Sequence, residues 1–156
     1  MEISKKLDYS LCMLSEVARL GEGETLSVRT AAERHGIPYS FARTIQHDLM
    51  RSGLLVTTRG PHGGMRLARD ACSITLLDGV RVVEGDFLRS DIQSDDIVPS
   101  RFEPLWRQLD LVLEVFLGSV TLEQLAVDRL MPTVSAGLDI RLTPLPAAKE
   151  EGVKEA

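Results

Sequence analysis

One stretch decides the fold of this 156-residue chain: SVRTAAERHGIPYSFARTIQHDLMRSGLLVTTRGPHGGMRLAR, at residues 27–69. It begins with two short amphipathic segments on either side of a Gly-Ile-Pro turn, and this pattern predicts two helices. Two apolar runs follow, at residues 54–58 and 65–68, and the six residues between them include three glycines and a proline. These runs predict a β-hairpin with a tight turn. Two helices followed by a hairpin are the plan of a winged helix-turn-helix.

Positive charge is concentrated in the same stretch. Residues 29–69 contain seven arginines against Glu33 and Asp48, a net charge of +5, although the whole chain has a net charge of −5. A local cationic surface on an acidic protein is the electrostatic footprint of a phosphate-binding face. Residues 86–156 have a net charge of −6 and should therefore face away from nucleic acid.

The composition is otherwise typical of a globular protein, with 44% hydrophobic and 26% charged residues. The two cysteines, Cys12 and Cys72, form no CxxC pair, which argues against a disulfide scaffold and fits a reducing cytoplasm. No stretch reaches the ~18 apolar residues of a membrane span, and the N-terminus lacks the apolar region of a signal peptide. We therefore expect a cytoplasmic protein without a membrane partner.

The second helix of the stretch is the candidate DNA-reading element. Phe41, Ile45 and Leu49 recur at i, i+4 and i+8 and should point to the core, with Ser40 as the N-cap. The opposite face carries side chains that suit base edges and phosphates, since Arg pairs with guanine and Gln with adenine. In the wing, Arg59 is suited to a narrow minor groove. A solvated face and an ordinary hairpin turn are the alternatives. The expected DNA-binding residues are Arg29, Tyr39, Ser40, Arg43, Thr44, Gln46, His47, Arg59, Gly60 and His62.

A first helix is predicted ahead of this stretch. Ser4 is its expected N-cap, and its apolar stripe includes Leu7 and Leu14. Cys12 and Met13 fall off that stripe, where they would meet a second surface, either another helix or a partner subunit.

Further helices are predicted after the hairpin. Thr75 with Asp78, and Thr121 with Gln124, have the spacing of a capping box. Between them, a long amphipathic helix is expected at about residues 101–117. The expected division of the chain is a winged helix-turn-helix at 1–85, an acidic loop at 86–100, dimerisation helices at 101–131 and a disordered tail at 132–156.

The long helix has a broad apolar face outside the compact DNA-binding unit, and such a face needs a partner. Dimerisation is the economical explanation, because helix-turn-helix proteins usually read palindromes as two-fold dimers. Packing within the chain is the alternative. The expected dimerisation residues are Leu105, Leu109, Val112, Leu113 and Phe116.

These pieces together resemble the bacterial winged-helix family of the iron–sulfur cluster regulator, the nitric-oxide-sensing repressor and the cysteine-metabolism repressor. The matching motifs, which lie within residues 1–130, are ISKKLDYSLCML, AERHGIP, TTRGPHGGMRLAR, ITLLDGVRVVEG and PLWRQLDLVLEVFLGSVTLEQL. The resemblance implies a mainly α fold with a small β-hairpin wing and a long C-terminal dimerisation helix. It also implies base contacts from Ser40 and Arg43, and a wing arginine at Arg59.

One departure from that family concerns the cofactor. Many members carry three cysteines after the VEG motif, and these bind an iron–sulfur cluster that switches DNA affinity. Here residues 86–104 contain neither cysteine nor histidine, and Asp91, Asp95 and Asp96 occupy the region. Because clusters require soft thiolate ligands, we expect no cluster, no metal site and no other cofactor.

The sequence as a whole predicts a sequence-specific DNA-binding regulator, a homodimeric repressor that acts on a palindromic operator. Its effector would be a small molecule or a protein. Two alternatives remain open: a winged-helix module that binds a partner enzyme, and a thiol sensor that uses Cys12 or Cys72, although isolated cysteines are usually buried small hydrophobes. An enzyme is not indicated, because the sequence has no nucleophile–base pair, carboxylate–histidine motif or cofactor fingerprint.

Overall fold

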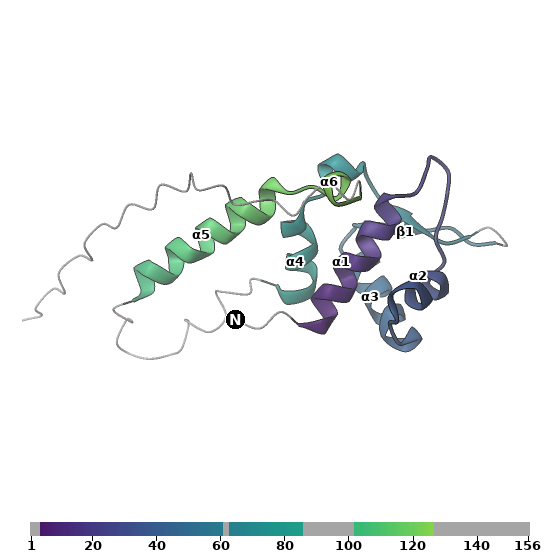
Figure 1. Ribbon diagram of the computed structural model, residues 1–156, viewed down its shortest axis with the longest axis horizontal. Helices are drawn as coiled ribbons and strands as arrows, with labels where there is room; N and C mark the ends of the chain where they lie inside the picture. Colours follow the sequence, from purple (N-terminus) through teal and green to yellow (C-terminus); the bar gives the residue numbers. More distant parts are fainter. Residues whose placement is uncertain (1–3, 61–62, 86–101, 127–156) are drawn as a thin grey trace, which may run out of the picture.

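The computed structural model of the chain describes residues 4–60, 63–85 and 102–126. The helices and strands, in chain order, are α1 (Lys5–Ala18), α2 (Val28–His35), α3 (Tyr39–Arg51), β1 (Leu55–Thr57), β2 (Met65–Leu67), a 3-10 helix (Ala71–Ser73), α4 (Leu76–Glu84), α5 (Glu103–Ser119) and α6 (Leu122–Ala126). The hairpin and α5 extend from opposite ends of the molecule (Figure 1). The predicted fold class, a winged helix-turn-helix with a long C-terminal helix, is confirmed.

Helix α1 is the centre of the core and contacts α2, α3, α4, α6 and β2. The Ser4 hydroxyl caps it by accepting a hydrogen bond from the Leu7 N–H at 3.1 Å, as predicted. Leu14, on the predicted apolar stripe, is fully buried, and Met13, which falls off that stripe, is fully buried as well. The second surface expected for Met13 therefore lies within this chain, because neighbouring elements enclose α1 on more than one side.

The helix-turn-helix closes tightly between α2 and α3. Gly36 ends α2 with a left-handed backbone at φ +62°, a conformation that glycine adopts without steric cost. Ile37 then donates its N–H to the Ala32 carbonyl at 2.9 Å and buries its side chain. Ala31 is completely buried, and its small side chain lets the two helices approach closely.

The prediction that Ser40 caps α3 is wrong. Helix α3 begins at Tyr39, its N-cap position is Pro38, and no side chain caps it. The Pro38 carbonyl accepts hydrogen bonds from the Phe41 and Ala42 N–H groups, both at 2.9 Å, so the backbone alone closes the first turn. Ala42 is completely buried, whereas Phe41 is half-buried.

The wing (β1, β2 and the turn between them) is an antiparallel hairpin in which Leu55 pairs with Leu67. Its strands lie within one residue of the predicted runs at each end. An unpredicted third segment joins it, because Leu26 and Met65 exchange backbone hydrogen bonds of 3.0 and 2.7 Å. This pairing brings the backbone so close that a Cβ on Gly64 would lie 2.8 Å from the Leu26 carbonyl.

Helix α4 begins with the predicted capping box. The Thr75 hydroxyl accepts the Asp78 N–H at 3.2 Å, and the Asp78 carboxylate accepts the Thr75 N–H at 2.9 Å. The same reciprocal bonds join Thr121 and Gln124 at the start of α6.

The chain returns to the core at the end of α5. Leu76 donates its N–H to the Val120 carbonyl, and Leu122 donates its N–H to the Ile74 carbonyl, both at 2.8 Å. The Leu122 side chain is completely buried. Residues 120–122 therefore help to complete the core around α1 and α4.

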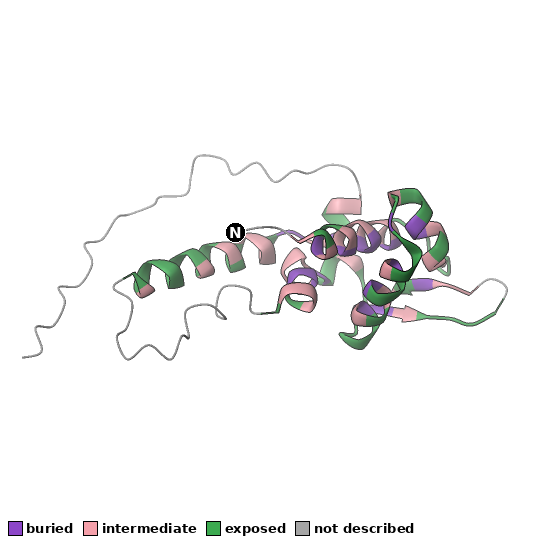
Figure 2. Cartoon of the chain, turned by 90° about the horizontal axis from the view of Figure 1, so that it is seen from below, coloured by how far each residue is buried: buried purple, intermediate pink, exposed green. Residues whose placement is uncertain are grey.

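Helix α5 itself contains no buried residue (Figure 2). Leu105, Leu109 and Val112 are 41–50% exposed, and the predicted stripe is completed by the half-buried Leu113 and Phe116. Two further apolar side chains that the sequence analysis did not single out are even more open: Leu111 is 60% and Val115 is 65% exposed. Among the described helices, none is both long and apolar enough to cross a membrane.

Several expectations fall outside the described residues: the acidic loop, the tail, the end of the dimerisation region at residue 131 and the placement of His62.

Candidate nucleic-acid interface

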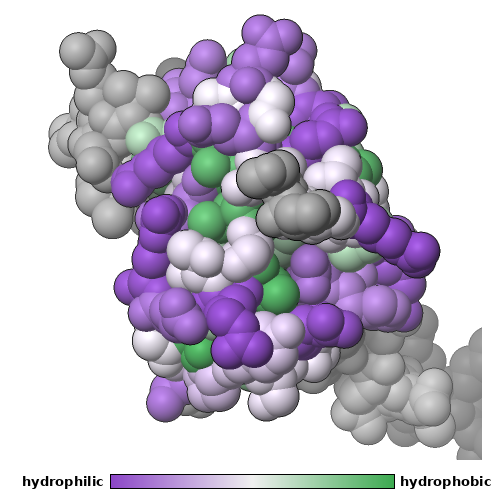
Figure 3. Space-filling view, turned by 90° about the vertical axis from the view of Figure 1, so that its right-hand side faces the viewer, coloured by the Kyte–Doolittle hydropathy of each residue, from purple (hydrophilic) through white to green (hydrophobic). Residues whose placement is uncertain are grey.

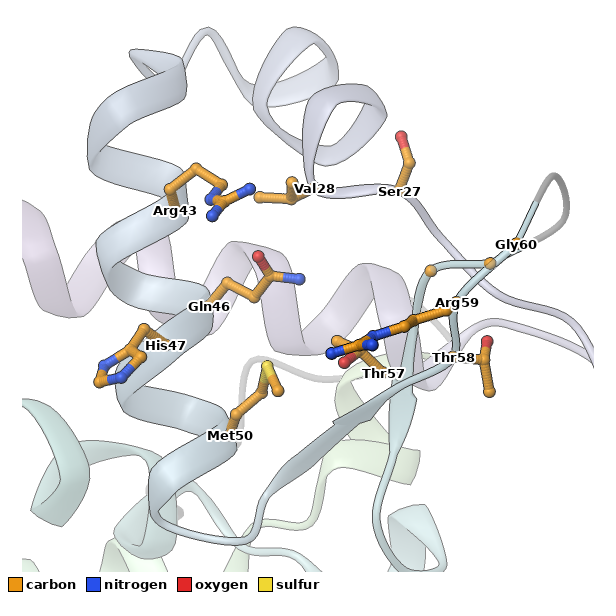
Figure 4. Close-up of a pocket in the computed structure, with 12 residues that line it drawn as sticks. Ser27, Val28, Arg43, Gln46, His47, Met50, Thr57, Thr58, Arg59 and Gly60 are labelled. Atoms are coloured by element: carbon orange, nitrogen blue, oxygen red, sulfur yellow. The ribbon is translucent and has the colours of Figure 1, made fainter.

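A hollow of about 530 Å³ separates α3 from the wing (Figure 4). Its walls come from α3, from the wing and from the first residues of α2. The lining residues are Ser27, Val28, Arg43, Gln46, His47, Met50, Thr57, Thr58, Arg59, Gly60, Gly63 and Gly64. Figure 3 shows the end of the molecule that carries the wing, where hydrophilic residues surround a few hydrophobic ones.

Helix α3 forms the wall of the hollow that faces the wing. Ile45 and Leu49 are completely buried, which leaves Arg43 and His47 exposed on the opposite side, as the helical period predicts. In Figure 4, Arg43 and Gln46 extend toward the wing, and His47 lies on the other side of the helix in this view.

The wing contributes a second cation to the hollow. Arg59 is exposed, and its side chain extends from the end of β1 toward α3 (Figure 4). Gly60 follows at φ +120°, in the region that favours glycine, so the chain turns sharply after Arg59. Arg43 and Arg59 thus approach the same hollow from opposite walls, and this arrangement suits an anionic strand between them.

Four other predicted DNA-binding residues do not line the hollow and lie at the start of α2 and on the first half of α3. Arg29 at the start of α2 stacks on the Tyr39 ring at the start of α3, with its guanidinium 4.8 Å from the ring centre. Ser40 and Thr44 are exposed on α3, and the Thr44 hydroxyl donates to the Ser40 carbonyl at 3.2 Å.

Part of the lining was not predicted from the sequence. Met50 lies one turn after Gln46, so the helical period alone would have placed it on the same wall. Thr57 and Thr58 depend on the strand register, and Ser27 and Val28 depend on how α2 meets the wing. Sequence pattern gives no signal for these four.

The two cysteines occupy different elements and environments. Cys12 is half-buried on α1, and burial raises the pKa of its thiol, with a further rise from the carboxylates of Asp8 and Glu16. A raised pKa disfavours the reactive thiolate. Cys72 is exposed on the 3-10 helix.

The donor set does not fit a thiolate-held iron–sulfur cluster. The 156 residues contain two cysteines, fewer than the four ligands that a cluster usually takes. Within the described parts of the chain, no three His, Cys, Asp or Glu side chains gather closely enough to hold a metal ion.

Comparison with known proteins finds transcriptional regulators among the relatives of this chain. The transcriptional regulator CymR of Bacillus subtilis is 35% identical over 127 residues, which cover 81% of this chain and 90% of CymR. The transcriptional regulator IscR of Vibrio parahaemolyticus is 29% identical over 146 residues, or 91% of this chain and 87% of that protein.

Solved structures agree with the sequence relatives. The structure of B. subtilis CymR, described as the global cysteine regulator, covers 82% of this chain and 98% of its own, with a TM-score of 0.71 and 28% identity. The IscR of T. potens covers 88% and 94%, with a TM-score of 0.69 and 26% identity. A family profile described as "Rrf2: Iron-dependent Transcriptional regulator" matches residues 3–128. The chain therefore belongs to the Rrf2 family of DNA-binding transcriptional regulators.

Proposed function

We propose that this protein is a sequence-specific repressor that binds a palindromic operator as a homodimer, without an iron–sulfur cluster. The observation that carries the proposal is the hollow between α3 and the wing, with Arg43 on one wall and Arg59 on the other. The rest of the chain is acidic, so these arginines mark the face that attracts a polyanion.

The hollow matches the path of one DNA strand. A recognition helix enters the major groove, and an arginine on the wing reaches the neighbouring minor groove. The sugar–phosphate strand that separates these two grooves then runs between α3 and the wing. Thr57 and Thr58 line this hollow and carry hydroxyls of the kind that bind phosphate oxygens, while Arg43 and Gln46 suit guanine and adenine edges.

The proposed dimer forms through α5. This helix has 17 residues, none of them buried, and its apolar stripe contains Leu105, Leu109 and Val112. A stripe along one helix can pack against the same stripe of a second copy about a two-fold axis. Such a dimer presents two copies of α3, and two half-sites of a palindrome would bind them together.

Repression is the simpler regulatory outcome for this design. A dimer bound across a promoter blocks polymerase by occupancy alone and needs no activating surface. The donor set described above also favours a regulator whose DNA affinity does not depend on a thiolate-held cluster. A small molecule or a partner protein would then be the effector.

Selection of bound duplexes from random-sequence DNA, followed by gel-shift measurement, tests the proposal. We expect one palindromic motif that binds at least ~1000-fold more tightly than a scrambled duplex of the same length. Arg43→Ala should lower that preference by roughly 5- to 150-fold, whereas Arg107→Ala on the distant α5 should leave it unchanged. Equal binding to selected and scrambled DNA would reject sequence-specific regulation and favour a protein-binding role for the fold.

A further inference from the structure

Asp48 is the single carboxylate on α3, the helix that faces DNA in the proposed function. One of its oxygens lies 2.8 Å from the Lys6 ammonium of α1. The Asp48 side chain is 18% exposed and the Lys6 side chain is 33% exposed, so solvent screens this pair less than an ordinary surface pair. The hydrogen bond from Lys6 holds the pKa of the Asp48 carboxyl below its ordinary value, and the group is therefore charged at neutral pH.

The other oxygen of Asp48 faces a histidine and an arginine of its own helix. The His47 ring nitrogen Nδ1 lies at 3.7 Å and an Arg51 guanidinium nitrogen lies at 4.0 Å. Both side chains are more than 70% exposed. Asp48 thus contacts α1 through one oxygen and lies near two exposed side chains of α3 through the other.

Two opposing effects on DNA binding follow from this position. The negative charge repels phosphates, so it lowers the sequence-independent part of the affinity. The 2.8 Å contact with Lys6 holds the carboxylate of α3 against α1, 3.7 Å from His47 and 4.0 Å from Arg51, and this arrangement favours a single register on the bases. The first effect weakens binding to every sequence, whereas the second strengthens binding to the correct one.

We propose that Asp48 is a positioning residue that sets DNA specificity: held by Lys6, it orients His47 and Arg51 and reduces attraction to unrelated DNA. This inference rests on the proposed function, because it requires that α3 meets DNA. If Asp48 served only the stability of the fold, its replacement would change the affinities for operator and unrelated DNA equally or leave both unchanged.

The test compares Asp48→Asn with wild type on two duplexes, the selected operator and its scrambled form. We expect weaker operator binding, tighter binding to scrambled DNA, and a ratio of the two affinities that falls about three- to tenfold. Asp48→Glu should recover most of that ratio. Glu33→Gln removes one negative charge from an exposed site on α2 and is the matched control. It should leave the ratio within twofold of wild type.

Lys6→Met provides an independent variant. Lys6 is already paired with Asp48 and should not contact a phosphate. Its replacement by Met should therefore reduce operator affinity without changing the slope of log Kd against log salt concentration. A slope that falls by about one unit would instead make Lys6 a phosphate contact and overturn the proposal. An unchanged affinity ratio in a folded Asp48→Asn protein would overturn it as well. Wild-type protein that shows no operator preference would reject the proposed function first, so the two failures are distinguishable.

Discussion

The guanidinium of Arg29 lies over the ring of Tyr39, 4.8 Å from its centre. This contact joins the first turn of α2 to the first residue of α3 across the helix-turn-helix. The ring face attracts the cation and limits its motion, while the N–H groups at the edge of the guanidinium stay able to bind a phosphate. In the proposed complex, Tyr39 would therefore orient Arg29 for a phosphate contact before DNA binds.

The Tyr39 ring, rather than its hydroxyl, should support operator binding. Tyr39→Phe keeps the aromatic face and should bind like wild type. Tyr39→Leu removes it and should cost about 0.5–1 kcal/mol of operator binding, or roughly two- to fivefold in Kd. Fluorescence anisotropy on labelled operator measures both. Equal losses for the two variants would assign the effect to the hydroxyl.

Residues on the two walls of the hollow should fail in different ways. Arg43→Ala and Gln46→Ala should each cost about 1–3 kcal/mol and relax the preference at particular base pairs, since they would remove the proposed bidentate base contacts. Arg59→Ala should weaken binding to many sequences and reduce the salt dependence. Titrations over a salt series, with operator variants at each position, distinguish these patterns. Wild-type behaviour of all three variants would refute the groove assignment.

Disruption of the α5 stripe should produce monomers. Leu109→Asp or Val112→Asp places a charge where the proposed dimer excludes water, and an unpaired buried charge is strongly unfavourable. Operator affinity should fall with the dimer, because a monomer reads a single half-site. Light scattering reports the mass, and Arg107→Gln on the polar side of the same helix is the control. A monomeric wild-type protein would contradict the dimer.

Gly64 should tolerate no side chain, because a Cβ there would lie 2.8 Å from the Leu26 backbone. Gly64→Ala should lower the free energy of unfolding by about 1–3 kcal/mol, as overpacking does elsewhere. Gly118→Ala in α5 is the matched control, since its new Cβ would meet, among the described residues, only Leu77 at 3.8 Å, and alanine favours a helix. Urea unfolding compares the two. A neutral Gly64→Ala would show that the Leu26 segment moves aside easily.

Operator binding should need no iron. Protein purified without oxygen should carry substoichiometric iron and sulfide and show no visible absorbance, because Cys12 and Cys72 are the chain's two cysteines. The Cys12→Ser, Cys72→Ser double variant should bind operator like wild type. Stoichiometric iron that disappears in this variant would require a cluster held between subunits.

Local signals were the most reliable guide to this fold. The capping boxes at Thr75 and Thr121 depend on residues three apart, and both form as predicted. Ser40 shows the limit of such reasoning. It is a favoured capping residue, but the Pro38 carbonyl accepts the hydrogen bonds of the first turn of α3 instead. The pairing of Leu26 with Met65 joins segments 39 positions apart. Leu26 lies in a loop without periodicity, so no sequence pattern predicts this pairing.

The same distinction applies to the candidate site. The helical period identified the exposed side of α3, including Arg43, because burial of Ile45 and Leu49 determines which side faces outward. The period says nothing about which side chains from other elements meet that face. The 2.8 Å contact between Lys6 and Asp48 depends on how α1 crosses α3, which the sequence pattern does not contain.

The return of the chain to the core after α5 has a consequence for operator spacing. Hydrogen bonds at Val120 and Leu122 tie the end of α5 to the body that carries α3. A helix of 17 residues is about 25 Å long, so an α5-mediated dimer would hold its two copies of α3 at a fixed separation. One extra base pair between half-sites would rotate the second by about 34° around the DNA axis. The protein would then distinguish operators by the phase of their half-sites as well as by their sequence.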